Sequence, residues 1–355
     1  MQKTPKIVAV AAVLIVVGAA IGYAVYASQP PPANSCPASA SSSVGPSVDP
    51  LFAPAHSTLP GSGRSVSPAD HPRPSAAGPV IRVVAAENFW GSLVSQLGGN
   101  DTSVLSIVSD PNADPHEYEA NTSDATAIAN AQFVIVNGVG YDTWALNLIA
   151  AASTTGQVVL NVGDLNGVVV GGGIVSGNPH MWYNPVFVNR TVAAMYSDLV
   201  EIAPGDTADF QANYATLNVS LASLYGEAGV IKAKFAGTTV ASTESIFVYL
   251  ANYTGLNLIS PPEFMQAVAE GNDPPADTVV TFQCQLESGK VSVLIYNEQT
   301  VTPLTSNMKT IAVENNVTVV GVTETIQPPG TSFEVWMNAQ YLQLENALNA
   351  KALSQ

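Results

Sequence analysis

Charged residues are scarce in this 355-residue chain, at 11% of the sequence, well under the usual quarter. Basic residues are the scarcest, with 11 Lys and Arg against 27 Asp and Glu, which gives a formal net charge of −16 at pH 7. Binding to nucleic acid, or to an anionic membrane through basic patches, needs clusters of Lys and Arg. The composition therefore argues against both partners and favours the attraction of cations.

Cysteine is almost absent: the chain has only Cys36 and Cys284. The first falls in a segment rich in proline and serine, and the second in a predicted helix, so we expect no disulfide between them. A disulfide framework and a cysteine-based zinc site are both excluded by this count. Lipidation of Cys36 is not favoured either, because residues 33–35 lack the leucine of a bacterial lipobox.

The N-terminal segment indicates export. Residues 1–6 carry Lys3 and Lys6, and Ile7–Ala27 is uncharged and apolar, at the length of about 20 residues that spans a bilayer. We predict that residues 1–27 are a signal or a membrane anchor with the basic end inside. Residues 28–79 are predicted to form a disordered tether, because a Pro/Ser-rich stretch buries no core. The protein would then stand on the outer face of the cytoplasmic membrane, or be secreted if residues 1–27 are cleaved.

From residue 80 onward, short apolar runs alternate with helical patterns. The runs are mostly apolar rather than alternating, as in parallel strands that are covered on both faces. Strands are predicted at 80–86, 103–108, 133–137, 158–162, 238–242, 256–259, 291–296 and 317–322. Helices are predicted at 88–97, 123–131, 143–152, 185–200, 207–235, 245–253, 275–288, 303–315 and 333–350.

The predicted helix at 207–235 would be about 40 Å long, which is long for a crossover within one sheet. Leu217, Leu221, Leu224 and Ile231 recur along it near helical spacing. We therefore predict an α/β fold of two lobes with parallel sheets, bridged by one long helix. The N-terminal lobe would span 80–204, the linking helix 205–236 and the C-terminal lobe 237–355.

Histidine is also rare, and its placement suggests a metal site. His56 and His71 fall in the predicted tether, whereas His116 and His180 each follow a proline in the predicted lobes. These two histidines, together with Glu244 and Glu324, all lie beyond the carboxyl ends of predicted parallel strands, where α/β sheets place their ligands. The four side chains are therefore candidate ligands of one metal ion in the cleft between the lobes.

Each candidate also has a simpler interpretation. A histidine after a proline is more often a turn residue than a ligand. Glu244 would suit the N-terminus of a helix, and Glu324 a solvated loop. Other polar and aromatic neighbours are expected to cap turns or to form packing walls rather than to bind the ion; these are Asp114, Glu119, Tyr118 and Trp182.

Four segments resemble the ligand elements of the zinc/manganese solute-binding proteins of ABC importers, the metal-binding cluster A-I type. Asp114–Glu119 and Asn178–Pro185 resemble the two histidine elements, while Ser242–Phe247 and Val322–Ile326 are similar to the two that follow. The resemblance implies a monomer that captures Mn²⁺ or Zn²⁺ outside the cytoplasm for an ABC permease, without catalysis.

This chain departs from the family pattern at several points. Asn178 and Asn184 stand where acids are usual, so the support of His180 is expected to differ. Glu324 is one methylene longer than the usual Asp, and Ala120 replaces a proline.

The ligand types leave the choice of metal open. Two neutral imidazoles and two carboxylates neutralise a divalent cation, and carboxylates that bind through one or two oxygens allow four to six ligand atoms. Oxygen ligands and an expandable geometry favour Mn²⁺, which is our first expectation, but the Irving–Williams order favours Zn²⁺.

Two other functions compete with metal capture for import. A metallohydrolase would need an open coordination position and a general base. A surface adhesin or sensor of the same fold is also compatible with the anchor and the tether.

Overall fold

The computed structural model describes residues 80–112 and 114–353. The predicted signal or anchor (1–27) and the predicted tether (28–79) lie outside the described residues, together with Cys36, His56 and His71. Within the described part of the chain, no helix combines the length and the apolar character that crossing a bilayer requires.

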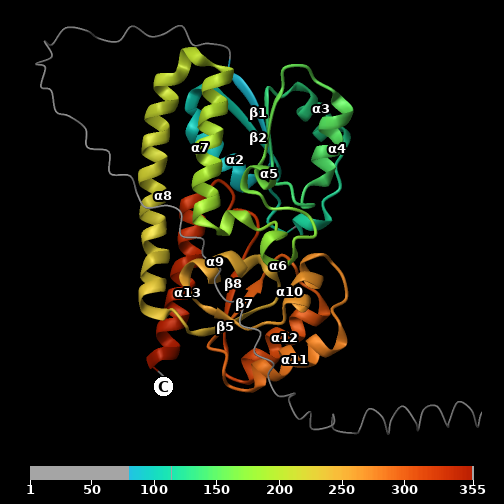
Figure 1. Ribbon diagram of the computed structural model, residues 1–355, viewed down its shortest axis with the longest axis vertical. Helices are drawn as coiled ribbons and strands as arrows, with labels where there is room; N and C mark the ends of the chain where they lie inside the picture. The colour runs from blue at the N-terminus through green and yellow to red at the C-terminus, as the bar shows by residue number, and fades with distance from the viewer. Residues whose placement is uncertain (1–79, 113, 354–355) are drawn as a thin grey trace, which may run out of the picture. The chain divides into compact units, whose positions relative to one another are not determined.

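The N-terminal lobe is built on a sheet of four parallel strands in the order β2-β1-β3-β4. Figure 1 labels β1 and β2 of this sheet. The strands are β1 (Ile81–Glu87), β2 (Thr102–Val108), β3 (Phe133–Val136) and β4 (Val158–Asn161). The helices of this lobe are α2 (Asn88–Gly98), α3 (Thr122–Asn130), α4 (Thr143–Ala152), α5 (Val162–Asn166), α6 (Gly173–Ser176) and α7 (Pro185–Ile202).

Helices cover both faces of this sheet, which explains its continuously apolar strands. Val83 and Ala85 of β1 belong to a core shared with α2 and α7. Their neighbours Val84 and Ala86 point the other way, into a second core with Ile128 of α3 and residues of α4. Successive side chains of a strand face opposite sides, so a strand buried on both sides shows no polar alternation.

The C-terminal lobe repeats this plan with a parallel sheet in the order β6-β5-β7-β8. Its strands are β5 (Thr239–Ser242), β6 (Asn257–Leu258), β7 (Val293–Asn297) and β8 (Thr318–Val322). Its helices are α9 (Val248–Thr254), α10 (Pro262–Ala269), α11 (Ala276–Glu287), α12 (Pro303–Glu314) and α13 (Phe333–Leu353). The adjacency of β5, β7 and β8 matters below, because their carboxyl ends carry the acidic side of the site.

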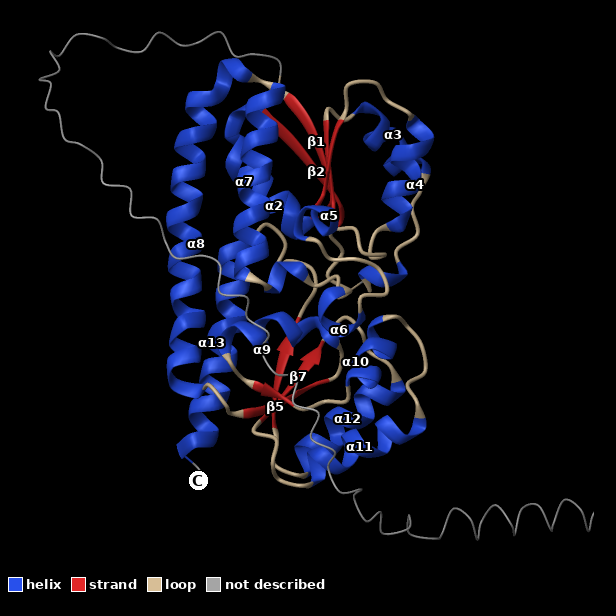
Figure 2. Ribbon diagram, viewed as in Figure 1, coloured by secondary structure: helices blue, strands red, loops and turns tan. Residues whose placement is uncertain are grey.

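The long helix α8 (Thr207–Phe235) runs beside both lobes (Figure 2). It contacts α2 and α7 of the N-terminal lobe and α9 and α13 of the C-terminal lobe. Its buried side chains follow helical spacing: Phe210, Leu217, Leu221, Leu224, Ala228, Ile231 and Phe235. They belong to one hydrophobic core that also includes strand residues of both sheets, so the two lobes share a continuous core.

The predicted fold class is confirmed: two parallel-sheet α/β lobes with a long connecting helix. Three short helices are missing from the sequence prediction: α5, α6 and α10. The first two span too few residues to show a period, and α6 lies inside the glycine-rich stretch 167–177. The single helix predicted at 245–253 is a 3₁₀ turn (Ser245–Phe247) followed by α9.

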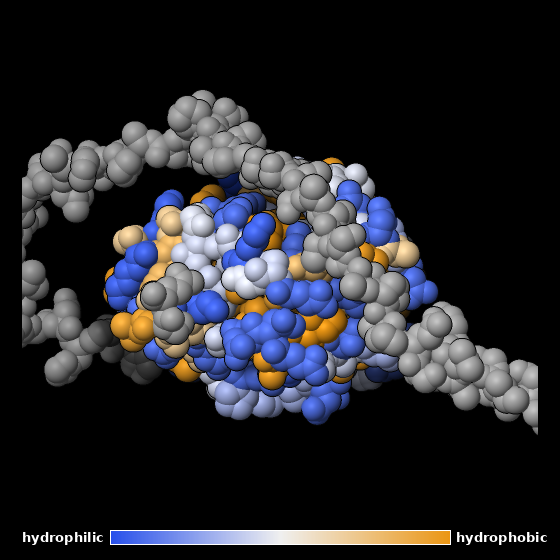
Figure 3. All heavy atoms as spheres, turned by 90° about the horizontal axis from the view of Figure 1, so that it is seen from below, coloured by the Kyte–Doolittle hydropathy of each residue, from blue (hydrophilic) through white to orange (hydrophobic). Residues whose placement is uncertain are grey.

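Exposed large apolar side chains are scattered over the described surface. Val170, Val219 and Val335 are among the most exposed, and they lie apart in sequence, in the loop before α6, in α8 and in α13. The face shown in Figure 3 is largely hydrophilic, with small hydrophobic areas between the polar residues. Single exposed apolar residues of this kind are ordinary on a protein surface.

The shared core predicts a large effect for a substitution in the middle of α8. Leu221→Ala removes a side chain that is 1% exposed, and it should lower the free energy of unfolding by about 2–5 kcal/mol. Val219→Ala on the same helix, at a position 73% exposed, is the matched control and should change it by less than about 0.5 kcal/mol. Urea denaturation measures both, and equal effects would contradict the shared core.

Candidate metal centre

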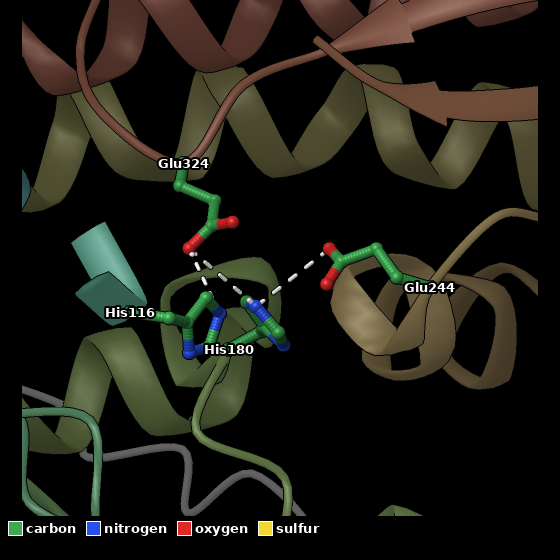
Figure 4. A group of neighbouring side chains, drawn as sticks. All are labelled: His116, His180, Glu244 and Glu324. Atoms are coloured by element: carbon green, nitrogen blue, oxygen red, sulfur yellow. Dashed lines mark ion pairs between the residues drawn. The ribbon is translucent and has the colours of Figure 1, made fainter. Parts of the chain in front are cut away.

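The four predicted ligands approach one point from both lobes (Figure 4). His116 lies in the 3₁₀ turn Pro115–Glu117 after β2, and His180 lies between α6 and the turn Met181–Tyr183. Glu244 and Glu324 follow β5 and β8. One ligand atom from each side chain lies within 4.8 Å of all the others, so the structure brings together every residue of the predicted set.

The distances suit a small coordination sphere. The Nε2 atom of His116 lies 3.3 Å from Oε2 of Glu324. The Nε2 atom of His180 lies 3.7 Å from the same oxygen and 3.8 Å from Oε1 of Glu244. Ligand atoms about 2.1 Å from a tetrahedral ion would be separated by about 3.4 Å. The arrangement therefore fits one divalent cation with little adjustment.

Burial isolates this cluster from solvent. The side chains of His180, Glu244 and Glu324 are fully buried, and that of His116 is 15% exposed. A cavity of about 300 Å³ adjoins His116 and is lined by residues of the glycine-rich stretch and of α10, among them Val170, Ile174 and Gln266. His116 is thus the candidate ligand that lines this cavity.

The turn that carries His116 is fixed by its own sequence. Pro115 begins the turn, and the backbone N–H of His116 donates to Oδ1 of Asp114 at 2.9 Å. The expectation that Asp114 caps a turn is confirmed. Its second oxygen accepts a 3.3 Å hydrogen bond from the hydroxyl of Thr300 in the C-terminal lobe.

His180 is oriented by Asn178, one of the positions where this chain departs from the family pattern. The Oδ1 atom of Asn178 lies 2.7 Å from Nδ1 of the imidazole, and its Nδ2 donates to the carbonyl of Ser245 at 2.8 Å. Because an amide oxygen only accepts, the hydrogen lies on Nδ1 and the lone pair of Nε2 faces the cluster. Trp182 packs against His180 at 5.2 Å and stacks on Phe89, which confirms it as a packing wall.

The cluster strongly shifts the pKa values of its own groups. Burial lowers the pKa of His180 and raises that of Glu244 well above its ordinary value, with the charge of Glu324 adding to the latter. Burial acts against protonation of His116, but the charge of Glu324 outweighs it and raises the pKa of His116 to about 9. Burial also opposes ionisation of Glu324, yet protonated His116 holds its pKa well below the usual range. Without a cation, His116 and Glu324 therefore form a buried ion pair at neutral pH.

Two further residues of the site were not predicted from the sequence. Asn297 ends β7, between the strands that carry the two acids, and its Nδ2 donates to Oε1 of Glu324 at 2.6 Å and to Oε1 of Glu244 at 3.1 Å. Tyr141 donates its hydroxyl to Oε2 of Glu324 at 2.6 Å. The position of Asn297 beyond a strand end was the available signal, but neither residue type is a usual metal ligand.

The chain is similar in sequence and in fold to known metal-binding proteins. Residues 83–347 match the model of a protein family described as zinc-uptake complex component A, periplasmic. A Thermotoga maritima protein is 24% identical over 179 residues, which are 50% of this chain and 63% of that protein. The manganese-binding lipoprotein MntA of Halalkalibacterium halodurans is 24% identical over 269 residues, 74% of this chain and 86% of MntA.

Among solved structures, the periplasmic zinc-binding protein TroA from Treponema pallidum superposes with a TM-score of 0.64 at 15% identity. The superposition covers 76% of this chain and 99% of TroA, which shows the shared fold. The family match extends over most of the chain, from β1 to α13. The protein therefore belongs to the periplasmic zinc-uptake component A family, and the resemblance to zinc/manganese solute-binding proteins is confirmed.

Proposed function

We propose that this protein captures Zn²⁺ or Mn²⁺ outside the cytoplasm and delivers it to an ABC permease. The observation that carries the proposal is the convergence of His116, His180, Glu244 and Glu324 within 4.8 Å. Buried charges need partners or a metal, since an isolated buried ion is costly. A divalent cation bound by these four side chains would be neutralised by the two carboxylates.

Unpartnered atoms support the same proposal. Among the described residues, Nε2 of His116, Nε2 of His180 and Oε2 of Glu244 are buried and make no hydrogen bond. Buried polar atoms normally have a partner, and these three belong to the proposed ligand set. Nε2 of the two histidines lies only at ion-pair distances of 3.3–3.8 Å from the carboxylates, and a bound cation would give all three atoms a direct partner at once.

The relatives are named for different metals, so their names do not decide between Zn²⁺ and Mn²⁺ for this protein. MntA is named manganese-binding and TroA zinc-binding. The chain spans 63% of the Thermotoga relative, so neither the metal nor the partner is inherited from the match alone. We propose that residues 1–27 and 28–79 hold the lobes at the outer face of the membrane, where a permease receives the ion.

Transport explains the site better than hydrolysis does. A catalytic metal keeps an open position for water or substrate, whereas four side-chain ligands fill a tetrahedral sphere. An adhesin or sensor of the same fold would bind metal without delivering it. Genes for an ATPase and a permease beside the coding gene would support import over that alternative.

Removal of a buried imidazole tests the ligand set. His180→Ala should weaken the binding of Zn²⁺ and of Mn²⁺ more than about 100-fold, because one of four ligands is lost. His56→Ala, in the predicted tether, is the matched control and should leave the affinity unchanged. Competition with a chelator of known affinity measures both variants. Unchanged binding in His180→Ala would reject the proposed site.

The role of Asn178 gives a second prediction. Asn178→Ala removes the acceptor that fixes the tautomer of His180, so metal affinity should fall about 10- to 100-fold. Asn184→Ala is the matched control, since the Asn184 side chain accepts the backbone N–H of Val186 at the start of α7 rather than orienting His180. The same chelator competition distinguishes them, and equal losses would point to a general folding defect.

Metal binding should also release protons. His116, with a pKa of about 9, is protonated at pH 7 and must lose its proton to become a ligand. Affinity should therefore rise roughly tenfold per pH unit from pH 7 towards pH 9, with about one proton or more released per ion at pH 7. Calorimetry in buffers of different ionisation enthalpy measures the release. An affinity independent of pH over this range would contradict the ion pair.

A further inference from the structure

The hydrogen bonds of Glu324 assign its two oxygens to different tasks. Oε2 faces both imidazoles and accepts the hydroxyl of Tyr141 at 2.6 Å. Oε1 accepts Nδ2 of Asn297 at 2.6 Å and the hydroxyl of Thr300 at 3.3 Å. Figure 4 shows the outcome, with one oxygen of Glu324 directed at the two histidines and the other turned away.

The two residues that hold the Glu324 carboxylate, Tyr141 and Asn297, are themselves held in place by their surroundings. Tyr141 follows Gly138, Val139 and Gly140, three successive residues with positive φ of 77°, 56° and 82°. The carboxylate of Asp142 holds this turn by accepting the backbone N–H groups of residues 137 and 138 at 2.6 and 2.8 Å. This constrained turn therefore places the hydroxyl of Tyr141 within hydrogen-bond distance of Glu324.

Asn297 is held equally well on the other side. It is fully buried, and its Oδ1 accepts the backbone N–H of Gln299 at 3.0 Å. Its Nδ2 lies between the two acids, bonded to Glu324 and to Glu244. The backbone N–H of Glu324 in turn donates to Oε1 of Gln299 at 2.7 Å. Rotation of the Glu324 carboxylate would break the hydrogen bonds that its oxygens accept from Asn297, Thr300 and Tyr141 together.

A fixed carboxylate limits the number of ligand atoms. Oε1 of Glu324 accepts two hydrogen bonds, from Asn297 and Thr300, which occupy both of its lone pairs, whereas Oε2 accepts only that of Tyr141 and keeps a lone pair for an ion. For Glu324 to bind an ion through both oxygens, Oε1 would have to give up one of these buried hydrogen bonds. Glu244 is less restricted, because its Oε2 makes no hydrogen bond among the described residues. The four side chains can therefore supply four ligand atoms, or five with Glu244 bidentate, but not six.

We propose that Tyr141 and Asn297 make this site selective for Zn²⁺ over Mn²⁺ by holding Glu324 to a single ligand oxygen. The inference rests on the proposed function and names its cargo. Zn²⁺ is satisfied by four ligands in a tetrahedron, whereas Mn²⁺ favours six, mainly oxygen. The two residues act as positioning residues, since they contact a ligand rather than the ion.

The decisive measurement is the ratio of Zn²⁺ to Mn²⁺ affinity, not either affinity alone, because the Irving–Williams order favours zinc at any site. Tyr141→Phe removes the hydroxyl and keeps the ring. The ratio of Zn²⁺ to Mn²⁺ affinity should fall about tenfold, because the loss of one hydrogen bond of ordinary strength changes an equilibrium by about that factor. Asn297→Ala frees the other oxygen and should shrink the ratio at least as much. Tyr225→Phe is the control, since the Tyr225 hydroxyl is buried without a hydrogen bond among the described residues.

Affinities of the full-length protein and its variants are measured by chelator competition with each ion, and X-ray absorption gives the number of ligand atoms. We expect four or five around Zn²⁺ in the wild type and an increase around Mn²⁺ in both variants. If the wild type binds both ions and neither variant changes the ratio, the inference is overturned and the proposed function stands. If the wild type binds neither ion, both are overturned.

Discussion

The structure depends on placing two acids and two imidazoles together in a buried position between two lobes. Burying such charges costs free energy unless each has a partner of opposite charge or a hydrogen bond. In this protein the partners come from both lobes. His116 from one sheet and Glu324 from the other form the ion pair that links them. The surrounding polar groups serve this pair: Asn178 orients one imidazole, and Asn297 holds both carboxylates.

The topology explains why these residues meet. In a parallel sheet all carboxyl ends lie on one edge, and the two sheets of this protein direct those edges at each other. Strand order then decides which side chains are neighbours. Because β7 lies between β5 and β8, Asn297 is inserted between Glu244 and Glu324, which are 80 positions apart in sequence by their numbering.

Much of this could be predicted from the sequence, for identifiable reasons. The apolar runs of β1 and β3 predicted strands of a parallel sheet, and the helical period of residues 207–235 predicted the bounds of α8. The candidate ligand set could be predicted because histidine is rare here and because strand ends restrict where ligands lie. Tyr141 and Asn297 were not accessible, since their roles depend on the turn at 138–140 and on strand order rather than on residue type. The helix α10 was missed because its eight residues begin at the second of two prolines and give little periodic signal.

The core that runs through α8 and joins both sheets has a consequence for how an empty and a loaded molecule differ. A wide hinge motion of one lobe relative to the other would separate apolar side chains such as Leu221 and Leu224 from the residues they pack against and expose them to water. Under the proposed function, the shared core therefore opposes a wide hinge motion between the empty and the loaded molecule. The change on binding would be confined to the surroundings of His116, where the ion adds charge beside the cavity and its glycine-rich border. A permease would then have to recognise the loaded form at this small area of surface.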